Sequence, residues 1–349
     1  MLVSPSAIYP MVPFRQMVGT HDVVFITLES LRFDVAQQAH LRGETPNLSS
    51  LFPSGWECRH SPASFTLPSH IALFTGFLPT PIAKPRSPRL CAARIPGSDS
   101  IASDTFVFDE ASIPEALAAR GYRTVCVGGV SFFGNNEPVA KILPAFFQET
   151  FWKQRFGPGR KESIAEQYKV MHQVLSETAE PLMLFLNVAT THHPTTGYLD
   201  DLTNVPMRGG KPEESVESQA AALRHADREL GPLCDLLSAR RKSRRTFLMV
   251  CADHGDAFGE DGFWGHRLSH PTVMNVPYAH VVLDESFEPG VAPATSIGID
   301  TSTDGLAQDS GSCSGGGCDS NTGGAAASGR ASLDPLVSSG FALVPGRLS

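Results

Sequence analysis

Short apolar runs alternate with helix-like segments along most of the chain. The runs are rich in aliphatic and β-branched residues and are bounded by turn signals, which is typical of strands buried on both faces. They predict strands at residues 23–28, 122–128, 181–189, 246–252 and 277–283. Apolar residues at helical spacing predict helices at 69–74, 113–120 and 214–237, and the aromatic, amphipathic stretch 144–176 is also predicted to be helical. This alternation predicts an α/β fold, a three-layer αβα sandwich around a mainly parallel sheet.

Composition divides the 349 residues into a body and a tail. The stretch 286–349 is rich in Ser and Gly and has no sustained apolar periodicity, so it cannot bury enough apolar surface to offset its ordering entropy. We therefore predict an N-terminal extension at 1–19, one folded domain at 20–285 and a disordered tail at 286–349. Within the domain, the Pro-, Arg- and Ser-rich stretch 79–103 predicts a long loop.

No apolar run approaches the roughly 20 residues needed to cross a bilayer, so we expect no membrane span. The stretch 1–19 contains Pro5, Pro10 and Pro13 and no continuous apolar core, which does not resemble a secretory signal. We therefore expect a cytoplasmic protein. The cysteines of the body are widely spaced, which favours reduced thiols over disulfides.

The formal net charge is −8, and the body carries no basic stripe. Its densest basic run, at 240–245, comes just before a predicted strand and is interpreted as a solvated helix end, where cations suit the helix dipole. We therefore expect no nucleic-acid partner. The sequence leaves the oligomeric state open.

Polar residues follow three of the predicted strands. The carboxyl ends of parallel strands meet at one edge of a sheet, and α/β proteins bind ligands there. A hydroxyl-rich turn at 64–70 opens a predicted helix and is expected at the same edge. The side chains expected there are Glu29, Thr66, His192, His193, Asp253, His254, Asp256 and His266.

These side chains suggest metal-assisted ester chemistry. Glu29, Asp253 and His254 offer oxygen and nitrogen donors, a set suited to Mn²⁺, Zn²⁺ or Mg²⁺ rather than to a soft metal. Thr66 stands at a helix start, where backbone N–H groups favour an anion. A metal would lower the pKa of the Thr66 hydroxyl and make it an alkoxide nucleophile at neutral pH. The expected partner is a small-molecule anionic ester.

Three motifs in this order resemble the alkaline phosphatase superfamily, in particular its sulfatase-like branch. They are Glu29 after the first strand, the Thr-x-Pro-Ser-His turn at 66–70, and Asp253-His254-Gly255. The resemblance covers about residues 20–284, with further matches at Gly121-Tyr122 and His192-His193-Pro194. It implies an alkaline phosphatase-like fold and a metal-dependent hydrolase of phosphoric or sulfuric esters.

Departures from the sulfatase pattern indicate the subtype. Sulfatases present Cys or Ser in a Cys/Ser-x-Pro-x-Arg motif that is oxidised to formylglycine, whereas this chain has Thr66 and His70 at those places, and threonine cannot follow that route. Leu28 precedes Glu29 where sulfatases carry a second acid, which weakens the sulfatase-type calcium site. The set is similar to that of the single-metal phosphotransfer branch, which includes lipoteichoic-acid synthases and phosphoethanolamine transferases. Those enzymes use a Thr nucleophile and have transmembrane helices.

The resemblance implies one divalent metal, with Mn²⁺ or Zn²⁺ favoured and Mg²⁺ or Ca²⁺ still open. Its expected ligands are Glu29, Thr66, Asp253 and His254. His193 and His266 are expected to bind the ester or to protonate its leaving group. A second metal, drawing on His192, His193, Asp256 and His266, is less favoured because the strand before His192 offers Asn187 rather than an acid.

The leading hypothesis is a hydrolase of phosphoric esters that acts through a phospho-Thr66 intermediate. One alternative is a sulfuric-ester hydrolase. Another is a degenerate, non-catalytic member that binds a metal or a partner. Thr66 can also serve only as a helix cap. The substrate, and the choice between hydrolase and transferase, stay open; the 79–103 loop and the aromatic stretch 146–156 are expected to set specificity.

Overall fold

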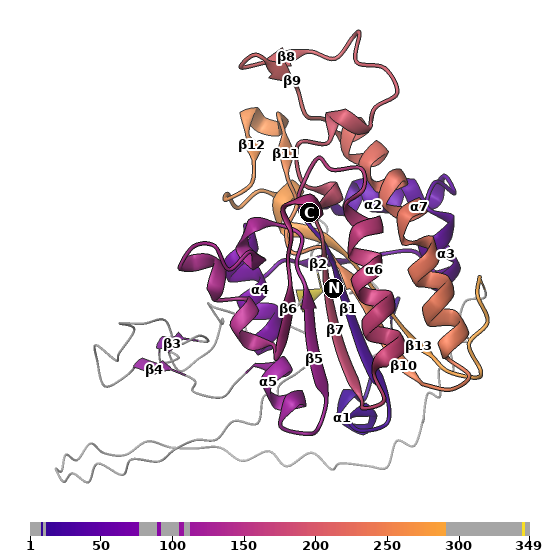
Figure 1. The fold of residues 1–349 in the computed structure, drawn as a ribbon. Helices are drawn as coiled ribbons and strands as arrows, with labels where there is room; N and C mark the ends of the chain where they lie inside the picture. Colours follow the sequence, from indigo (N-terminus) through magenta and orange to yellow (C-terminus); the bar gives the residue numbers. More distant parts are fainter. Residues whose placement is uncertain are drawn as a thin grey trace, which may run out of the picture. The chain divides into compact units, whose positions relative to one another are not determined.

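An eight-stranded sheet forms the middle layer of the fold (Figure 1). The protein is described here from a computed structural model, which defines residues 8–9, 12–76, 89–91, 105–107, 112–290 and 344–345. The sheet has the order β14-β2-β13-β10-β1-β7-β5-β6. Its strands are β1 (Asp22–Leu28), β2 (Glu57–His60), β5 (Arg123–Val127), β6 (Glu149–Phe151), β7 (Leu182–Val188), β10 (Thr246–Cys251), β13 (Asn275–Leu283) and β14 (Val344–Pro345).

The sheet is mixed but mostly parallel, as predicted. Strands β10, β1, β7, β5 and β6 run parallel to one another, whereas β13 is antiparallel to β10. In the register, Thr27 of β1 lies opposite Cys251 of β10 on one side and Asn187 of β7 on the other. The carboxyl ends of these three central strands are therefore level, so the residues that follow them lie side by side.

Helices cover both faces of the sheet and complete the predicted three-layer αβα sandwich (Figure 1). One layer holds α2 (Phe33–Leu41), α3 (Pro46–Leu51), α6 (Ser163–Glu177) and α7 (Val216–Arg240). The other holds α4 (Thr66–Thr75) and α5 (Ile113–Ala118). Short elements add α1 (Phe14–Met17), α8 (Pro271–Met274), and the strands β3 (Arg89–Cys91), β4 (Thr105–Val107), β8 (Met207–Arg208), β9 (Lys211–Pro212), β11 (Ala257–Phe258) and β12 (Trp264–Gly265).

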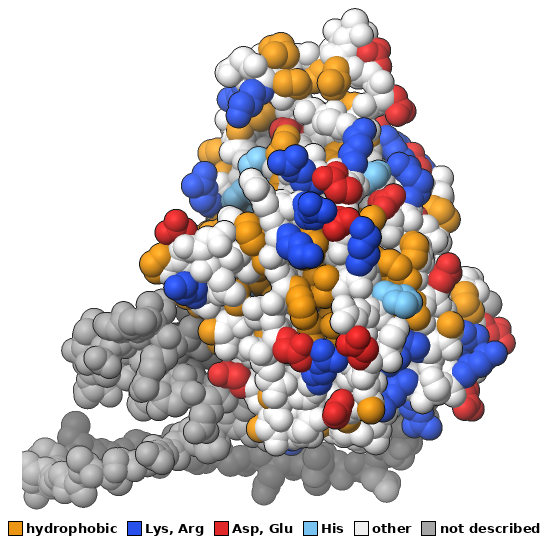
Figure 2. Space-filling view, viewed as in Figure 1, with side chains coloured by type: hydrophobic (Ala, Val, Ile, Leu, Met, Phe, Trp, Pro, Cys, Tyr) orange, Lys and Arg blue, Asp and Glu red, His pale blue; other side chains and the backbone are white. Residues whose placement is uncertain are grey.

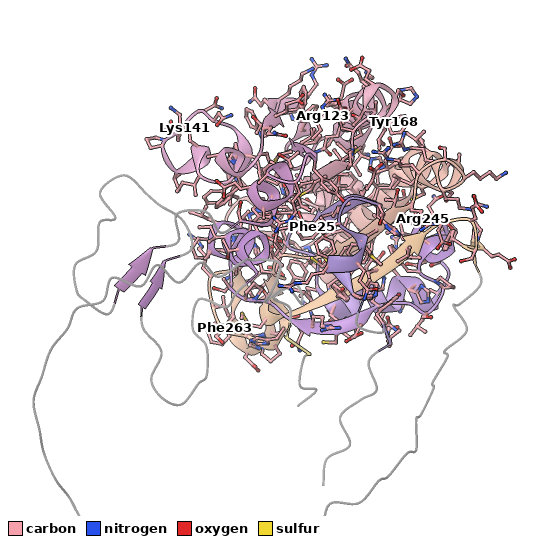
Figure 3. The ribbon with its side chains drawn as sticks, turned by 90° about the horizontal axis from the view of Figure 1, so that it is seen from below. Phe25, Arg123, Lys141, Tyr168, Arg245 and Phe263 are labelled. Carbon is pink, nitrogen blue, oxygen red and sulfur yellow. The ribbon has the colours of Figure 1, made fainter. Side chains whose placement is uncertain are left out.

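Aromatic packing joins the central strands to α4. The ring centroid of Phe185 on β7 lies 4.9 Å from that of Phe74 on α4 and 5.4 Å from that of Phe25 on β1. Figure 3, which looks at the molecule from below, shows Phe25 in the interior and Arg123 and Arg245 at the periphery. Every residue of β1, β7 and β10 is buried, which explains why their sequences are continuous apolar runs rather than alternating ones.

Polar side chains fix the position of the long helix α7. Ser215 caps its first turn, and Ser218 returns the hydrogen bond to form a capping box. Farther along, the buried carboxylate of Asp227 accepts hydrogen bonds from the backbone N–H groups of Asn47 and Leu48 at 3.2 and 2.8 Å. Asp227 thus satisfies the free amino end of α3 from a helix far away in sequence.

The structure differs from the sequence prediction in three places. The segment 144–176 is helical only from Ser163 onward, because Pro144 and the Gly157-Pro158-Gly159 turn interrupt it, and its first half forms 3₁₀ turns and the edge strand β6. Helices α2 and α3 and strand β2 were not predicted. Phe14, in the predicted N-terminal extension, packs against Phe247 of β10.

Two predicted segments lie largely outside the described residues. They are the 79–103 loop, of which only β3 is described, and the tail at 286–349, of which residues 286–290 and β14 are described. Strand β14 pairs antiparallel with β2.

Candidate active site

Glu29 is aimed by the turn that ends β1. Its backbone N–H donates to the carbonyl of Val188 at 3.0 Å, and the next residue, Ser30, adopts a left-handed conformation with φ 59°. The Glu29 side chain is fully buried. Its Oε1 accepts a hydrogen bond from Thr66 Oγ1 at 2.5 Å, and its Oε2 accepts one from Asn187 Nδ2 at 2.6 Å. The carboxylate is therefore held by the side chains of two other elements.

Thr66 is the first residue of helix α4. The N-cap residue is Phe65, which offers no side-chain oxygen, so the first-turn N–H groups have no side-chain cap. The Thr66 hydroxyl donates to Glu29 and does not cap the helix. Thr66 thus places an oxygen at the amino end of a ten-residue helix, where the dipole and free N–H groups favour negative charge.

Asp253 and His254 follow strand β10 after Ala252 and are both fully buried. Asp253 Oδ1 accepts a hydrogen bond from the backbone N–H of Ser30 at 3.0 Å. His254 Nδ1 lies 2.9 Å from the carbonyl oxygen of Gly255, so Nδ1 carries the hydrogen and Nε2 presents a lone pair. That Nε2 lies 3.3 Å from Asp253 Oδ2 and 3.9 Å from Glu29 Oε1.

These residues fit a divalent metal. Asp253 Oδ2 and His254 Nε2 are buried polar atoms without a hydrogen-bond partner among the described residues. Buried polar atoms are rarely left unpaired, so two of them facing a carboxylate and a hydroxyl indicate a cation ligand set. The donors are borderline, with three oxygens and one imidazole nitrogen, which suits Zn²⁺ or Mn²⁺. The four predicted ligands, Glu29, Thr66, Asp253 and His254, are thus brought together in the fold.

Burial perturbs the pKa values of both carboxyl groups. Burial, together with the charge of Asp253, raises the pKa of Glu29 to about 8. Burial likewise raises the pKa of Asp253 to about 7. Burial lowers the pKa of His254, which keeps its imidazole neutral and ready to bind a metal. Without a cation, the pair of carboxyl groups therefore holds protons at neutral pH.

His70 lies behind this group and not on an open helix face. It is fully buried, and its Nδ1 is 2.8 Å from the carbonyl oxygen of Thr66 and 3.7 Å from Asp253 Oδ2. Glu29, His70 and Asp253 also form a metal-capable set, with ligand atoms within 4.8 Å of one another. The hydrogen bond to Thr66 occupies Nδ1, however, so His254 is the better nitrogen ligand.

A second group of imidazoles lines the rim of the site. His193 Nδ1 lies 3.1 Å from Asp256 Oδ2, and His266 Nδ1 lies 2.7 Å from Asp256 Oδ1. The ring of His266 also lies near that of His254, with centroids 4.5 Å apart. The hydrogen bond to Asp256 raises the pKa of His193, while burial and the neighbouring imidazole lower the pKa of His192 to about 4.

Asp256 is the residue whose role the sequence did not reveal. It is buried, which opposes its ionisation, but the two rim imidazoles that it holds outweigh burial and lower its pKa. The ligand atoms of His192, His193 and His266 lie within 4.8 Å of one another and can hold a metal. The sequence placed Asp256 only among possible ligands of a second metal. Its position in the Asp-His-Gly-Asp run was the available signal.

A buried arginine anchors the hairpin that carries His266. Strands β11 and β12 form this hairpin above the carboxyl edge of the sheet (Figure 1). Arg32, which is 4% exposed, donates to Glu260 Oε1 at 2.5 Å and to Asp34 Oδ2 at 2.6 Å. The hairpin is thus tied to the start of helix α2.

Gly255 allows the loop after β10 to pass close to another backbone segment. Its N–H donates to the carbonyl of Val273 at 2.7 Å. A Cβ atom at this position would lie 2.1 Å from the carbonyl oxygen of Thr272, a contact that no side chain tolerates. The glycine of the Asp-His-Gly motif is therefore required by close backbone packing.

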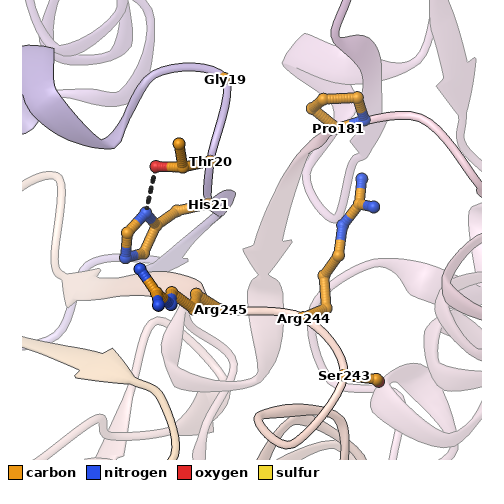
Figure 4. A pocket seen from close by; sticks show the side chains of 7 residues that line it. All are labelled: Gly19, Thr20, His21, Pro181, Ser243, Arg244 and Arg245. Atoms are coloured by element: carbon orange, nitrogen blue, oxygen red, sulfur yellow. Dashed lines mark hydrogen bonds between the residues drawn. The ribbon is translucent and has the colours of Figure 1, made fainter.

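A cavity of about 270 Å³ lies at the opposite edge of the sheet (Figure 4). Its lining residues are Gly19, Thr20, His21, Pro181, Ser243, Arg244 and Arg245. They precede β1, β7 and β10, whereas Glu29 and Asp253 follow β1 and β10. Arg244 is paired with the buried Asp22 at 3.0 Å. We therefore assign no part of the ester chemistry to this cavity.

Charges are mixed on the surface. The basic run at 240–245 ends helix α7, as predicted, and Arg240 donates to Leu175 O and Asp22. On the face drawn in Figure 2, basic and acidic side chains are interspersed rather than gathered into a stripe. Within the described part of the chain, no helix is long and apolar enough to cross a membrane.

The fold defines an αβα protein with buried polar residues at the carboxyl ends of its central strands, and sequence comparison identifies the family. The sequence model of the Sulfatase family matches residues 21–278. The chain therefore belongs to the sulfatase family. No curated protein matches the sequence.

Solved structures share the fold at low identity. The C-terminal periplasmic domain of phosphoethanolamine transferase EptC from Campylobacter jejuni is 14% identical, with a TM-score of 0.50 over 76% of this chain and 80% of that one. The soluble domain of lipooligosaccharide phosphoethanolamine transferase A from Neisseria meningitidis is 13% identical, with a TM-score of 0.51 over 77% and 78%. The C-terminal periplasmic domain of EcEptC from Escherichia coli, in complex with Zn, is 14% identical, with a TM-score of 0.50 over 74% and 72%.

Substituting Gly255→Ala is expected to destabilise the fold by about 1–3 kcal/mol, because the new methyl group forces the loop away from Thr272. Urea unfolding measures the change. Gly197→Ala is the matched control, since no described atom lies within 4 Å of the place that its Cβ would take and its φ is not positive. Equal stability of the two variants would contradict the packing role of Gly255.

Metal affinity is expected to rise with pH. Protons on Glu29 and Asp253 compete with the cation, and this competition ends only above the raised pKa values of about 8 and about 7. Each displaced proton strengthens binding by up to about tenfold per pH unit below those values. Calorimetric titration of metal-free protein with Mn²⁺, in buffers of different ionisation enthalpy, measures affinity and proton release together. Glu29→Gln should release fewer protons; pH-independent affinity between about pH 6 and about pH 8 would refute the assignment.

Proposed function

We propose that the protein is a metal-dependent hydrolase of phosphoric esters with Thr66 as its nucleophile. One observation carries the proposal. The Thr66 hydroxyl, at the amino end of helix α4, lies in the same buried site as Glu29 Oε1, Asp253 Oδ2 and His254 Nε2. Asp253 Oδ2 and His254 Nε2 have no hydrogen-bond partner among the described residues. Glu29, Thr66, Asp253 and His254 would hold one Zn²⁺ or Mn²⁺, with Mg²⁺ or Ca²⁺ less suited to the nitrogen ligand.

The protein's own groups prepare Thr66 for attack. Glu29 Oε1 already accepts the Thr66 hydroxyl hydrogen at 2.5 Å, so the proton has a defined path away from Oγ1. The uncapped amino end of α4 offers N–H groups to the oxygens of an anionic ester bound at Thr66. A bound metal would supply Lewis-acid chemistry, lowering the hydroxyl pKa and polarising the ester.

The rim imidazoles are suited to the leaving group. Asp256 orients His193 and His266 through their Nδ1 atoms, which leaves their Nε2 atoms to face a ligand. The raised pKa of His193 favours its protonated form, which can bind an anion and donate a proton. His193 is 45% exposed, so the leaving group can depart toward solvent.

Threonine at the nucleophile position favours phosphoryl over sulfuryl transfer. The sulfatase route needs a formylglycine made from Cys or Ser, and Thr66 does not provide it. A phosphoryl group on Thr66 can pass either to water or to an alcohol, so hydrolase and transferase share the first half of the reaction.

We also propose a cytoplasmic location, which the free thiols of Cys58, Cys126, Cys234 and Cys251 fit.

Thr66→Ala is expected to reduce turnover of phosphate esters at least about a thousandfold, because it removes the attacking oxygen. The assay uses Mn²⁺-loaded protein with p-nitrophenyl phosphate, bis-p-nitrophenyl phosphate and p-nitrophenyl sulfate. Thr66→Ser keeps a hydroxyl and should retain measurable activity. Full activity of Thr66→Ala would refute the mechanism, and faster turnover of the sulfate would favour the sulfatase alternative.

His193→Ala is expected to slow alkyl phosphate esters by about 10²-fold or more and nitrophenyl esters much less, because only a poor leaving group needs a proton. The wild-type rate for alkyl esters should fall as pH rises through the raised His193 pKa, and the variant should lose this dependence. His192→Ala is the matched control, since Asp256 does not hold its ring. Equal losses for both ester types would count against an acid role.

A further inference from the structure

A closed ring of hydrogen bonds adjoins the proposed metal position. Its members share almost complete burial and come from β1, the turn after it, α4 and β7. They are Thr66, Glu29, Asn187, Thr27 and His70. Thr66 and Glu29 are proposed metal ligands, whereas the other three residues have no role in the proposed reaction. Thr27 and Asn187 are paired in the sheet register, as polar residues within two apolar strands.

Asn187 donates both of its bonds in this ring. Its Oδ1 accepts hydrogen bonds from the backbone N–H groups of Gly129 and Val130 at 3.2 and 3.0 Å. Backbone N–H groups can only donate, so the amide oxygen must face them and the amide nitrogen must face the ring. The two hydrogens on Nδ2 then go to Glu29 Oε2 at 2.6 Å and to Thr27 Oγ1 at 3.0 Å.

The donor order continues from Thr27 to the nucleophile. Because Thr27 Oγ1 accepts from Asn187, its own hydrogen is free to point at His70 Nε2, 3.2 Å away. The Thr66 carbonyl can only accept a hydrogen bond, so His70 Nδ1, which lies 2.8 Å from it and 3.7 Å from Asp253 Oδ2, carries the ring hydrogen. Nε2 of this neutral ring then accepts the hydrogen of Thr27. The Thr66 carbonyl thus determines the tautomer of His70, and Thr27 satisfies its other ring nitrogen.

We infer that Asn187 and Thr27 are positioning residues for Glu29 and Thr66. Asn187 occupies Glu29 Oε2, which leaves Oε1 as the oxygen that meets Thr66, His254 and a cation. Thr27 holds the His70 ring through Nε2, and Nδ1–H of the same ring holds the first turn of α4 and presents a hydrogen, not a lone pair, toward Asp253. The consequence for catalysis rests on the proposed function, whereas the His70 tautomer is a property of the folded chain alone.

A ring that only satisfied buried polar groups would have a different signature. Removing one member would then lower the free energy of unfolding and leave metal affinity and kcat unchanged. A positioning role requires lower metal affinity and lower kcat, with little change in KM. The two roles are therefore separable by measurement.

The test uses Thr27→Val, which keeps the shape of the side chain and removes the hydroxyl, with Thr27→Ser as the matched variant that keeps it. Long-range ¹H–¹⁵N spectra of metal-free, ¹⁵N-histidine-labelled protein report the tautomer, and His70→Asn assigns the His70 signals. We expect the Nδ1–H tautomer in all three proteins, because the Thr66 carbonyl sets it, and a shifted Nε2 signal only in Thr27→Val, which no longer donates to that atom. We also expect Thr27→Val to weaken Mn²⁺ binding and lower kcat by about tenfold each, with little change in KM.

An Nε2–H tautomer of His70 in wild type overturns the inference. So does a Thr27→Val protein that loses stability while keeping wild-type Mn²⁺ affinity and kcat. Thr27→Ala removes the same hydroxyl without placing a methyl group against Asn187, and serves if Thr27→Val does not fold. If wild type cleaves no ester, the proposed function fails, but the tautomer and Mn²⁺ measurements still decide the positioning role.

Discussion

The burial of two neighbouring carboxyl groups, Glu29 and Asp253, is the constraint around which the site is built. Parallel strands β1 and β10 end level with each other, and helices on both faces exclude water from their ends. Burying a lone carboxylate costs several kcal/mol, and burying two together costs more. This cost is reduced by hydrogen bonds from Ser30, Thr66 and Asn187 to the carboxyl groups, and by the neighbouring neutral imidazole of His254. The proposed divalent cation would complete the charge balance.

The motif residues were predictable because each directly follows an element that its own sequence defines. Glu29 and Asp253 come straight after apolar runs, and Thr66 starts a helix, so strand topology alone brings them together. The three-layer architecture was predictable for the same reason. The mostly helical expectation for 144–176 was wrong because amphipathic spacing was given more weight than the prolines and glycines within it.

Hydrogen bonds between residues far apart in the sequence could not be predicted. Asp227 caps α3 from 180 residues away, and nothing in its helix marks that partner. Asn187 and Thr27 were visible as polar residues inside apolar strands. Their meaning depends on the register of β1 against β7, which apolar patterns leave undefined. The two hydrogen bonds that Asp256 makes with His193 and His266 likewise require two loops to meet at one carboxylate.

The tie between Arg32 and the β11–β12 hairpin has an evolutionary consequence. The proposed metal ligands lie at the ends of strands and at the start of helix α4. The rim imidazoles, in contrast, lie on loops that are joined to this region through Asp256 and Arg32. Sequence changes in these loops would preserve the contacts only if they keep Asp256, Arg32 and Glu260, so diversification at the rim is restricted by the buried core.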